Sequence, residues 1–484
     1  MVNLRLIYKI IGSLLFLEAG FMLTCVIMSL SYHEHDLIAF LLSMLITFAA
    51  GLVLKYMGRE SDNRLSRRDS YLVVTLTWVV FSLFGMLPFY IGGYITDITN
   101  AYFETISGFT TTGATILDDV ERLPHALLFW RTMTQWIGGL GIVFFTIAIL
   151  PSMVGGSVRI FSAEATGPIK TKMHPRLTTT AKWIWSIYFG LTLACLFSYY
   201  AAGMDWFDSA NYAMTTLATG GFATHNDSNE FFHSATIDYI TVLFMFLSGI
   251  NFMALYSALF KWRFKSLLNS EFKLYVSIVL LSSAFITYML ITRNDYTLPQ
   301  ALRSSLFQVV SFITTTGLFN DDASAWPRVT WIVLGGLMFV GASAGSTSGG
   351  FKCIRAVMLL KVLRNEFRHI LHPSAVLPVK VNGMAVPHSR IVSLLAFLTL
   401  NIVMLIIATT ILISAGIDNT NAISIALSCL SNVGPTLGYE FGPVMSWDML
   451  PGYIKWTCSL LMLMGRLEII SVLVLFSREF WKDN

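Results

Sequence analysis

Long apolar segments alternate along the chain with short polar stretches. A helix needs about 20 mostly apolar residues to cross a bilayer, and ten segments meet this length. They are residues 8–31, 37–57, 71–93, 127–150, 183–203, 236–260, 274–292, 328–360, 391–415 and 452–477. No connection between them is long enough for a soluble domain of about 100 residues. The pattern therefore predicts an all-α membrane protein with many spans.

Four shorter apolar segments interrupt this series, at residues 100–110, 208–217, 299–313 and 420–431. At 1.5 Å per residue, a helix of about twelve residues is only about 18 Å long, whereas the hydrocarbon core is about 30 Å thick. Each short helix must therefore enter the membrane and return on the same side. We expect four pseudo-symmetric repeats of a span, a short pore helix and a second span, preceded by an N-terminal helix pair.

A tract rich in threonine and glycine follows each short segment. The tracts are residues 110–113, 218–221, 314–317 and 432–435. Their aligned glycines are expected at Gly113, Gly220, Gly317 and Gly434, with intervals of 107, 97 and 117 residues. Irregular backbone is tolerated at membrane depth only where it is buried in protein or lines a watery cavity. We therefore expect the four tracts to meet around one central pore.

Such tracts have the chemistry of an ion site. Backbone carbonyls and threonine hydroxyls can replace part of an ion's hydration shell, and the negative ends of the short helices favour a cation. No ring of Asp or Glu marks the tracts, which favours a monovalent ion. The candidate ion-binding residues are Thr111, Thr112, Gly113, Ala218, Thr219, Gly220, Thr315, Thr316, Gly317, Asn432, Val433 and Gly434. The alternative is that each tract is only a turn between helices.

Composition and charge agree with a membrane protein. Of the 484 residues, 55% are hydrophobic and 12% are charged, whereas soluble domains carry about 25% charged residues. The N-terminus, the C-terminus and alternate loops hold 25 of the 32 Lys and Arg residues. The positive-inside rule therefore puts both termini in the cytoplasm. The net charge of +4 reflects this topology and does not indicate a nucleic-acid partner.

A run of small residues lies in the middle of the apolar segment 328–360. Residues 341–350 contain four glycines, and each glycine costs a helix up to about 1 kcal/mol. We expect a broken helix whose loop lies beneath the tracts as a gate. The candidate gate residues are Gly341, Gly345, Ser346, Thr347, Ser348, Gly349 and Gly350. The alternative is an unbroken helix that uses small residues for close packing.

A single arginine, Arg466, lies near the centre of the last apolar segment. A mid-membrane arginine costs at least about 2.5 kcal/mol on insertion scales, so its side chain should face a partner or a cavity. Glu468 is two residues away and does not share its helix face. Two interpretations remain, a pore-facing arginine and an interhelical salt bridge.

The tracts Thr-Thr-Thr-Gly-Ala (110–114), Ala-Thr-Gly-Gly-Phe (218–222), Thr-Thr-Thr-Gly-Leu (314–318) and Asn-Val-Gly-Pro (432–435) resemble the filters of the Trk/Ktr/HKT potassium transporter superfamily. The resemblance covers residues 70–484, and the extra helix pair at 1–57 resembles the TrkH-type bacterial subunits. It divides the chain into an N-terminal segment (1–69) and four repeats (70–182, 183–272, 273–389 and 390–484).

This resemblance implies potassium uptake across the bacterial inner membrane, with K⁺ as the transported ion and no covalently bound cofactor. It also implies a homodimer with one pore in each chain, surrounded by membrane lipid, and a cytosolic TrkA-type ring that binds the regulatory nucleotide. Glycine rather than serine at Gly113 is the arrangement associated with K⁺ over Na⁺ in this superfamily. The resemblance further implies that the loop at 341–350 blocks the pore and that Arg466 lies below the filter. Asn432 and Val433 depart from the threonine-rich pattern of the other tracts.

Three alternatives remain open. An intramembrane enzyme would need ionisable residues that converge at the membrane, and the spans contain few of them and no paired-carboxylate or nucleophile pattern. A secondary transporter with two larger repeats would show twofold symmetry and no dipping tracts. A Na⁺-permeable or K⁺/Na⁺-coupled relative within the superfamily is disfavoured by Gly113.

Overall fold

The computed structural model describes residues 2–62, 65–141, 177–375, 377–438 and 446–482, and these form a helical protein with one small antiparallel sheet. The helices are α1 (Leu4–Tyr32), α2 (Leu37–Met57), α3 (Arg67–Gly85), α4 (Leu87–Ile91), α5 (Ile98–Phe109), α6 (His125–Gly139), α9 (Leu177–Ala201), α10 (Trp206–Ala218), α11 (Ala235–Ser248), α12 (Phe252–Lys261), α13 (Ser270–Arg293), α14 (Leu298–Ile313), α15 (Arg328–Val340), α16 (Cys353–Leu371), α17 (His388–Ser414), α18 (Asn419–Ser431), α19 (Gly452–Leu467), α20 (Ile469–Leu473) and α21 (Arg478–Trp481). The strands are β1 (Lys380–Val381) and β2 (Met384–Ala385), and short 3₁₀ turns occupy Val120–Arg122, Ser228–Phe232, Phe264–Ser266, Ala323–Ala325 and Val474–Phe476.

In the part of the chain that the structure describes, the candidate membrane spans are fewer and more broken than the apolar pattern predicts. Among the described residues, six helices are long and apolar enough to cross a membrane, or eight if each of two bent pairs counts as one span. The expectation of a continuous span at 236–260 is wrong, because α11 and α12 meet at an angle of 101°. The segment 452–477 is likewise bent by 113° between α19 and the helical stretch that begins with α20. Residues 142–150 of the segment 127–150 lie outside the described part.

The four short helices form where the sequence predicts them. They are α5, α10, α14 and α18, with lengths of 12, 13, 16 and 13 residues. Aspartates start three of them, because the side chains of Asp97, Asp205 and Asp418 accept hydrogen bonds from free N–H groups of the first turn. None of the four is long enough to span a bilayer.

Each short helix packs between two neighbouring units of the chain. We define unit 1 as α3, α5 and α6, unit 2 as α9, α10 and α11, unit 3 as α13, α14 and α15, and unit 4 as α17, α18 and α19. Every short helix contacts the first span of its own unit and also the second span of the preceding unit: α5 contacts α19, α10 contacts α6, α14 contacts α11, and α18 contacts α15. These contacts close a ring of four units.

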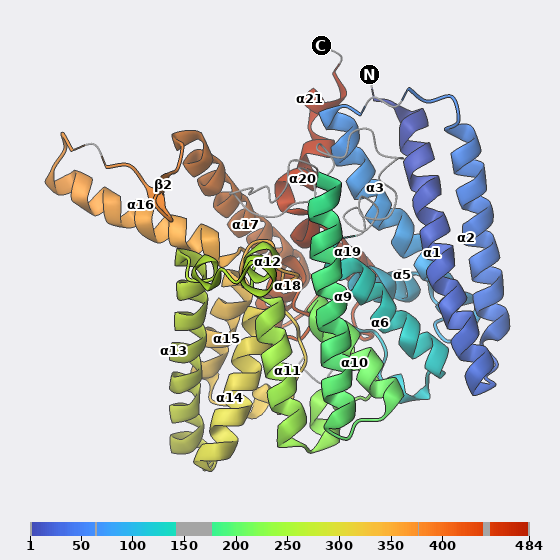
Figure 1. Cartoon of the computed structure of the whole chain (residues 1–484), viewed down its shortest axis with the longest axis horizontal. Coiled ribbons are helices and arrows are strands. Elements are labelled where there is room, and N and C mark those ends of the chain that lie inside the picture. Colours follow the sequence, from blue (N-terminus) through green and yellow to red (C-terminus); the bar gives the residue numbers. More distant parts are fainter. Residues whose placement is uncertain (1, 63–64, 142–176, 376, 439–445, 483–484) are drawn as a thin grey trace.

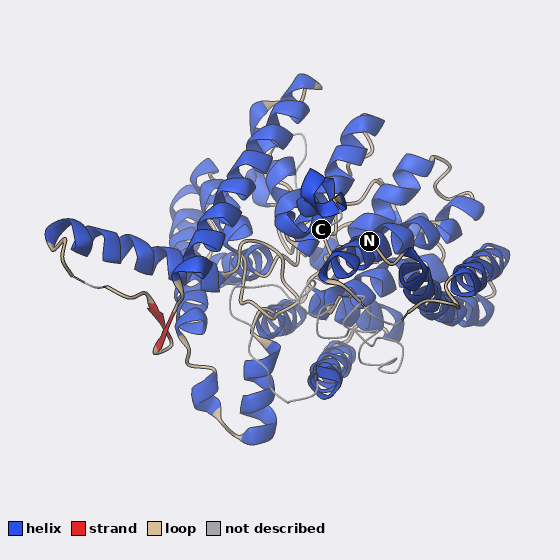
Figure 2. Cartoon of the chain, turned by 90° about the horizontal axis from the view of Figure 1, so that it is seen from above, coloured by secondary structure: helices blue, strands red, loops and turns tan. Residues whose placement is uncertain are grey.

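Two features lie outside this ring. The α1–α2 pair forms the edge of the molecule and joins the ring through contacts of α1 with α3 and α6 (Figure 1). On the opposite side, α16 and the β1–β2 hairpin project away from the body, as both views show (Figures 1 and 2). The two termini lie at the same end of the molecule (Figure 1).

Candidate functional site

The four tracts share one backbone conformation. The first residue after each short helix or its cap has a left-handed φ, of 54° at Thr111, 53° at Thr219, 56° at Thr315 and 55° at Asn432. Two residues later a glycine has a φ between 82° and 95°, and these glycines are Gly113, Gly221, Gly317 and Gly434. The intervening residue donates its N–H to the carbonyl five residues back, for example Thr112 to Ser107 at 2.9 Å and Thr316 to Ser311 at 2.8 Å. This is the Schellman ending of a helix.

The shared conformation corrects the predicted alignment of the second tract. Gly220 donates to Thr215 at 3.0 Å and is therefore equivalent to Thr112, whereas Gly221 is equivalent to Gly113. The expected positions in this tract are wrong by one residue, and Ala218 is the last residue of α10. Two adjacent glycines made the motif ambiguous, because either can adopt a positive φ.

The four tracts meet in a closed ring of close backbone contacts. A Cβ atom at Gly113 would lie 2.1 Å from the carbonyl oxygen of Gly220, which precedes Gly221 in the next tract. The same relation is found in the other three tracts, from Gly221 to Thr316 (2.2 Å), from Gly317 to Val433 (2.2 Å) and from Gly434 to Thr112 (2.4 Å). Only glycine permits this approach, and the sequence of contacts returns to the first tract. The interpretation of the tracts as independent turns is therefore wrong.

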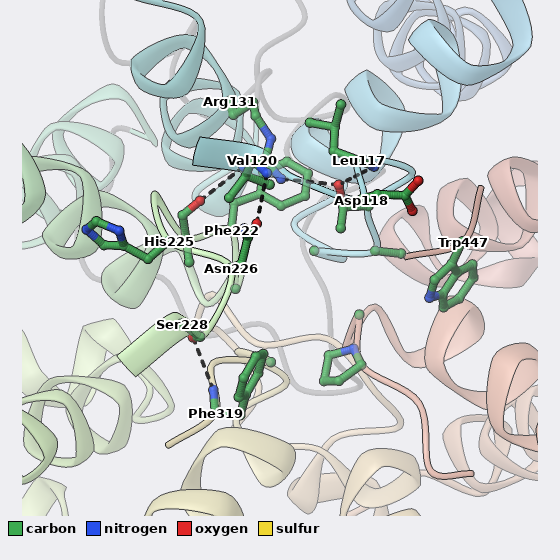
Figure 3. A pocket seen from close by; sticks show the side chains of 18 residues that line it. Leu117, Asp118, Val120, Arg131, Phe222, His225, Asn226, Ser228, Phe319 and Trp447 are labelled. Atoms are coloured by element: carbon green, nitrogen blue, oxygen red, sulfur yellow. Dashed lines mark hydrogen bonds between the residues drawn. The ribbon is translucent and has the colours of Figure 1, made fainter. Parts of the chain in front are cut away.

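All four of these glycines line one vestibule of about 80 Å³, which also includes the residues that follow the tracts (Figure 3). Its wall contains Asp118, Arg131, His225, Phe319 and Trp447 from different units. Because these side chains come after the glycines in the chain and the short helices come before them, the vestibule lies on the far side of the ring from the helix C-termini.

A buried ion pair supports the vestibule wall, and sequence reasoning assigned it no role. Arg131 on α6 contacts the carboxylate of Glu104 on α5 at 2.8 Å, and both side chains are almost fully buried. Glu104 also accepts hydrogen bonds from Thr115 and Ile116 just after the first tract. Arg131 donates to the carbonyl of Ala223 just after the second tract, at 3.1 Å. The pair thus holds the first two tracts together. An isolated charge at either position is the only sequence signal for it.

A histidine lies at the rim of the same vestibule. His225 contacts Asp208 through Nε2 at 2.9 Å and Glu121 through Nδ1 at 3.2 Å, and its ring stacks on Phe231. Partial burial lowers the pKa of His225, but the hydrogen bonds and negative charges of Asp208 and Glu121 outweigh it and raise the pKa above its ordinary value. The imidazole therefore links two polar segments of the rim.

The run of small residues forms a non-helical loop between α15 and α16, as predicted, so the alternative of an unbroken packed helix is wrong. Thr347 donates to the carbonyl of Leu217 at the end of α10 (3.0 Å), and the N–H of Gly349 donates to Thr315 in the third tract (2.6 Å). A Cβ at Gly349 would lie 2.1 Å from the carbonyl oxygen of Ser431 at the end of α18. The loop therefore contacts three units on the side of the ring opposite to the vestibule.

Arg466 reaches the same loop. Its guanidinium donates to the carbonyl of Thr347 at 2.9 Å and to the carbonyls of Gly138 and Gly139 at 2.6 Å each. The expected position near the centre of a straight span is wrong, because α19 ends at Leu467 and the chain bends there. Arg466 thus lies in the last turn of α19, where the helix dipole favours a cation. Glu468 faces elsewhere and pairs with Arg355 at 2.5 Å.

The fold and this site define a multi-pass membrane protein in which four irregular backbone segments form a ring between the helices. Comparison with known proteins agrees. Residues 37–484 match the model of the TrkH family, described as cation transport protein. The Trk system potassium uptake protein TrkH of Halomonas elongata is 36% identical over 483 residues, which cover 99% of this chain and 100% of the relative. The TrkH protein of Escherichia coli K12 is 35% identical with the same coverage.

The crystal structure of the potassium transporter TrkH from Vibrio parahaemolyticus matches the fold with a TM-score of 0.88 and 33% identity, covering 99% of both chains. The chain therefore belongs to the TrkH family of cation transport proteins. It is a transport protein and not an enzyme, and the alternative of an intramembrane enzyme is wrong.

The ring predicts that Gly221 in the second tract does not tolerate a side chain. Gly221→Ala is expected to lower cation uptake by about tenfold or more, because its Cβ would displace the Thr316 carbonyl from a position that transport requires. Rb⁺ uptake into proteoliposomes measures the effect. Gly203→Ala is the matched control, since Gly203 also has a positive φ, of 102°, but nothing lies within 4 Å of its added Cβ. Equal activity of the two variants would contradict the alignment at Gly221.

Proposed function

We propose that this chain takes up potassium through a K⁺-selective, channel-like pore whose filter is the ring of four tracts. The closed sequence of contacts between glycines and carbonyls carries the proposal, because it brings four irregular segments to one place inside the membrane. The printed names of the relatives, which are potassium uptake proteins and a potassium transporter, support potassium as the ion.

The chemistry of the ring favours a weakly hydrated monovalent cation. The C-terminal ends of α5, α10, α14 and α18 lead into it and carry partial negative charge. Carbonyl oxygens of Thr112, Gly220, Thr316 and Val433 would replace part of the hydration shell of K⁺. Among the described residues, no group of three or more His, Cys, Asp or Glu side chains could hold a metal ion, so acidic coordination of a divalent ion is not favoured there.

The four filter positions are not equivalent. The Gly220 carbonyl accepts a hydrogen bond from Gln135 at 2.7 Å, which leaves one of its two lone pairs for an ion. In the fourth tract, Asn432 donates to the hydroxyl of Thr112 at 2.9 Å and to the carbonyl of Met462 at 2.8 Å. The side-chain amide of Asn432 thus joins the fourth tract to the first. The shorter side chain of a threonine at this position would not reach Thr112. We infer one dominant ion site rather than a series of identical ones.

The proposal is tested by ion competition in proteoliposomes that contain the chain alone. Rb⁺ uptake should be inhibited by external K⁺ at concentrations where Na⁺ has little effect, because the fixed carbonyls match the larger ion. Equal inhibition by Na⁺ and K⁺ would instead favour a Na⁺-permeable or K⁺/Na⁺-coupled relative. Liposomes without protein are the control for leakage.

We further propose that the loop at 341–350, with Arg466, gates this pore from the cytoplasmic side. The loop contacts the ends of two short helices and the third tract, and the guanidinium of Arg466 fixes Thr347 in place. A positive charge on the path beneath the filter would also raise the barrier to a cation. The gate candidates Gly341, Gly345, Ser346, Ser348 and Gly350 belong to the same loop.

Deletion of residues 345–348 is expected to raise Rb⁺ flux of the chain alone several-fold, because it removes the Thr347 contact and shortens the loop beneath the ring. Flux per folded protein is measured after size-exclusion chromatography of each preparation. A correctly folded deletion variant with unchanged or lower flux would contradict the gate.

Arg466→Ala is expected to increase K⁺ flux, because it removes both the charge and the hydrogen bonds to Thr347, Gly138 and Gly139. Arg466→Lys should fall between Ala and the wild type, since lysine keeps the charge but lacks the rigid fork of donors. Single-channel or flux recordings of the three proteins measure the order. If Arg466→Ala leaves flux unaltered, the arginine has a purely structural role.

For the assembly, we propose a homodimer in the bacterial inner membrane, with repeats at 70–182, 183–272, 273–389 and 390–484. The exposed apolar side chains Leu360, Leu363, Phe367 and Ile370 on helix α16, which projects from the body in Figure 1, support a protein contact at that arm. Both termini and the basic loops would face the cytoplasm, where a TrkA-type ring carrying the nucleotide would bind.

A further inference from the structure

The break between α11 and α12 is hydrogen-bonded to the gate loop. The N–H of Ser343 donates to the carbonyl of Gly249 at 3.0 Å, and the N–H of Phe252 donates to the carbonyl of Gly345, also at 3.0 Å. These two bonds run in opposite directions between the same two segments, so they form a short backbone ladder. The break between α11 and α12 is therefore hydrogen-bonded to the loop between α15 and α16.

Two polar side chains form hydrogen bonds with Ala344, the loop residue between Ser343 and Gly345. Asn251 donates from its side-chain amide to the Ala344 carbonyl at 2.5 Å, and Glu271 at the start of α13 accepts the Ala344 N–H at 2.6 Å. Both polar groups of one loop residue are thus held by side chains from two different units. Glu271 is only 6% exposed, and a buried carboxylate is costly unless it makes such a bond.

Asn251 caps a helix in addition to binding the loop. Its side-chain oxygen accepts the N–H groups of Met253 at 2.9 Å and Ala254 at 3.1 Å, which caps α12. The oxygen therefore starts the helix, while the nitrogen holds the loop. Gly345 is confined by the same side chain, because a Cβ there would lie 2.8 Å from the Asn251 nitrogen.

The base of the loop is closed on itself, so its tip can move as one piece. The N–H of Phe351 donates to Phe339 at 2.9 Å, Lys352 to Val340 at 2.8 Å and Cys353 to Ala342 at 2.9 Å. These bonds join the end of α15 to the start of α16. The tip is kept beneath the filter by the side chains that bind Ala344 on one side and, on the other, by the bonds of Thr347 to Arg466 and Leu217 and of Gly349 to Thr315.

We propose that Asn251 and Glu271 are positioning residues that latch the gate loop closed, and that α12 is the lever that releases it. α12 runs from Asn251 to the basic segment that begins at Lys261, so a displacement of its far end is passed directly to Ala344. The latch rests on the proposed gate and adds a second point of control, separate from Arg466, through which a cytoplasmic partner would act.

The test compares two substitutions of Glu271, whose carboxylate also accepts a hydrogen bond from the backbone of Ile354. Glu271→Ala removes the acceptor for Ala344, whereas Glu271→Gln keeps an oxygen in its place. Rb⁺ flux of the chain alone should rise by about fivefold in Glu271→Ala, as expected for loss of a buried hydrogen bond, and should stay near the wild-type level in Glu271→Gln. A role that depends on the negative charge of Glu271 rather than on its oxygen would not be rescued by glutamine.

Asn251→Asp gives an independent measurement. It keeps the oxygen that caps α12 but loses the donor to Ala344, so it should raise flux as Glu271→Ala does. Asn269→Asp is the matched control, because Asn269 caps the neighbouring helix α13 by accepting the Phe272 N–H at 2.8 Å. Its flux should remain that of the wild type. Wild-type flux in both Glu271→Ala and Asn251→Asp would overturn the latch.

Deletion of residues 345–348 separates failure of the latch from failure of the gate. If that deletion raises flux but Glu271→Ala does not, the gate stands and the latch is wrong. If the deletion leaves flux unchanged, the gate itself fails. When both are correct, Glu271→Ala adds no further flux in the deletion background, because the two changes act through the same loop. An additive increase would show that Glu271 acts elsewhere and would overturn the latch.

Discussion

Close contact between backbone segments organises the structure. Four glycines let the Cα of each tract approach the carbonyl oxygen of the next to a distance that leaves no room for a Cβ. A bilayer offers no water to exposed backbone, so the tracts must satisfy their polar groups within the protein. The four short helices deliver them to one place, and the contact of each short helix with the preceding unit sets the order of the ring.

The two sides of this ring differ in chemistry. On one side, the buried pair of Arg131 and Glu104 ties the first two tracts together behind an open vestibule. On the other side, the loop between α15 and α16 lies against the helix ends and is held by side chains from three units. The vestibule wall is braced by an ion pair between two side chains, whereas Glu271, Asn251 and Arg466 bind the loop through its backbone groups. The proposed gate would open by releasing the second set of contacts.

Much of this could be predicted from the sequence, for identifiable reasons. Segment length revealed the short helices because about twelve residues cannot span a bilayer, and the glycine-rich run at 341–350 revealed the broken helix. The second tract was misaligned because Ala-Thr-Gly-Gly contains two adjacent glycines, and only the contact of Gly221 with the third tract distinguishes them. The bend at Asn251 was not predicted because Ser248, Gly249 and Asn251 are a weak interruption of a mainly apolar segment, and the loop that stabilises the bend lies about 90 residues further along the chain.

Locating the ion tests the central claim most directly. The protein would be crystallised in Rb⁺ in place of K⁺, and the anomalous signal of Rb⁺ would be mapped. The account predicts a single strong peak enclosed by the carbonyl oxygens of Thr112, Gly220, Thr316 and Val433, which weakens when K⁺ is added and persists when Na⁺ is added. An ordered ring with no peak inside it, or a peak bound only by the acidic side chains of the vestibule, would contradict the account.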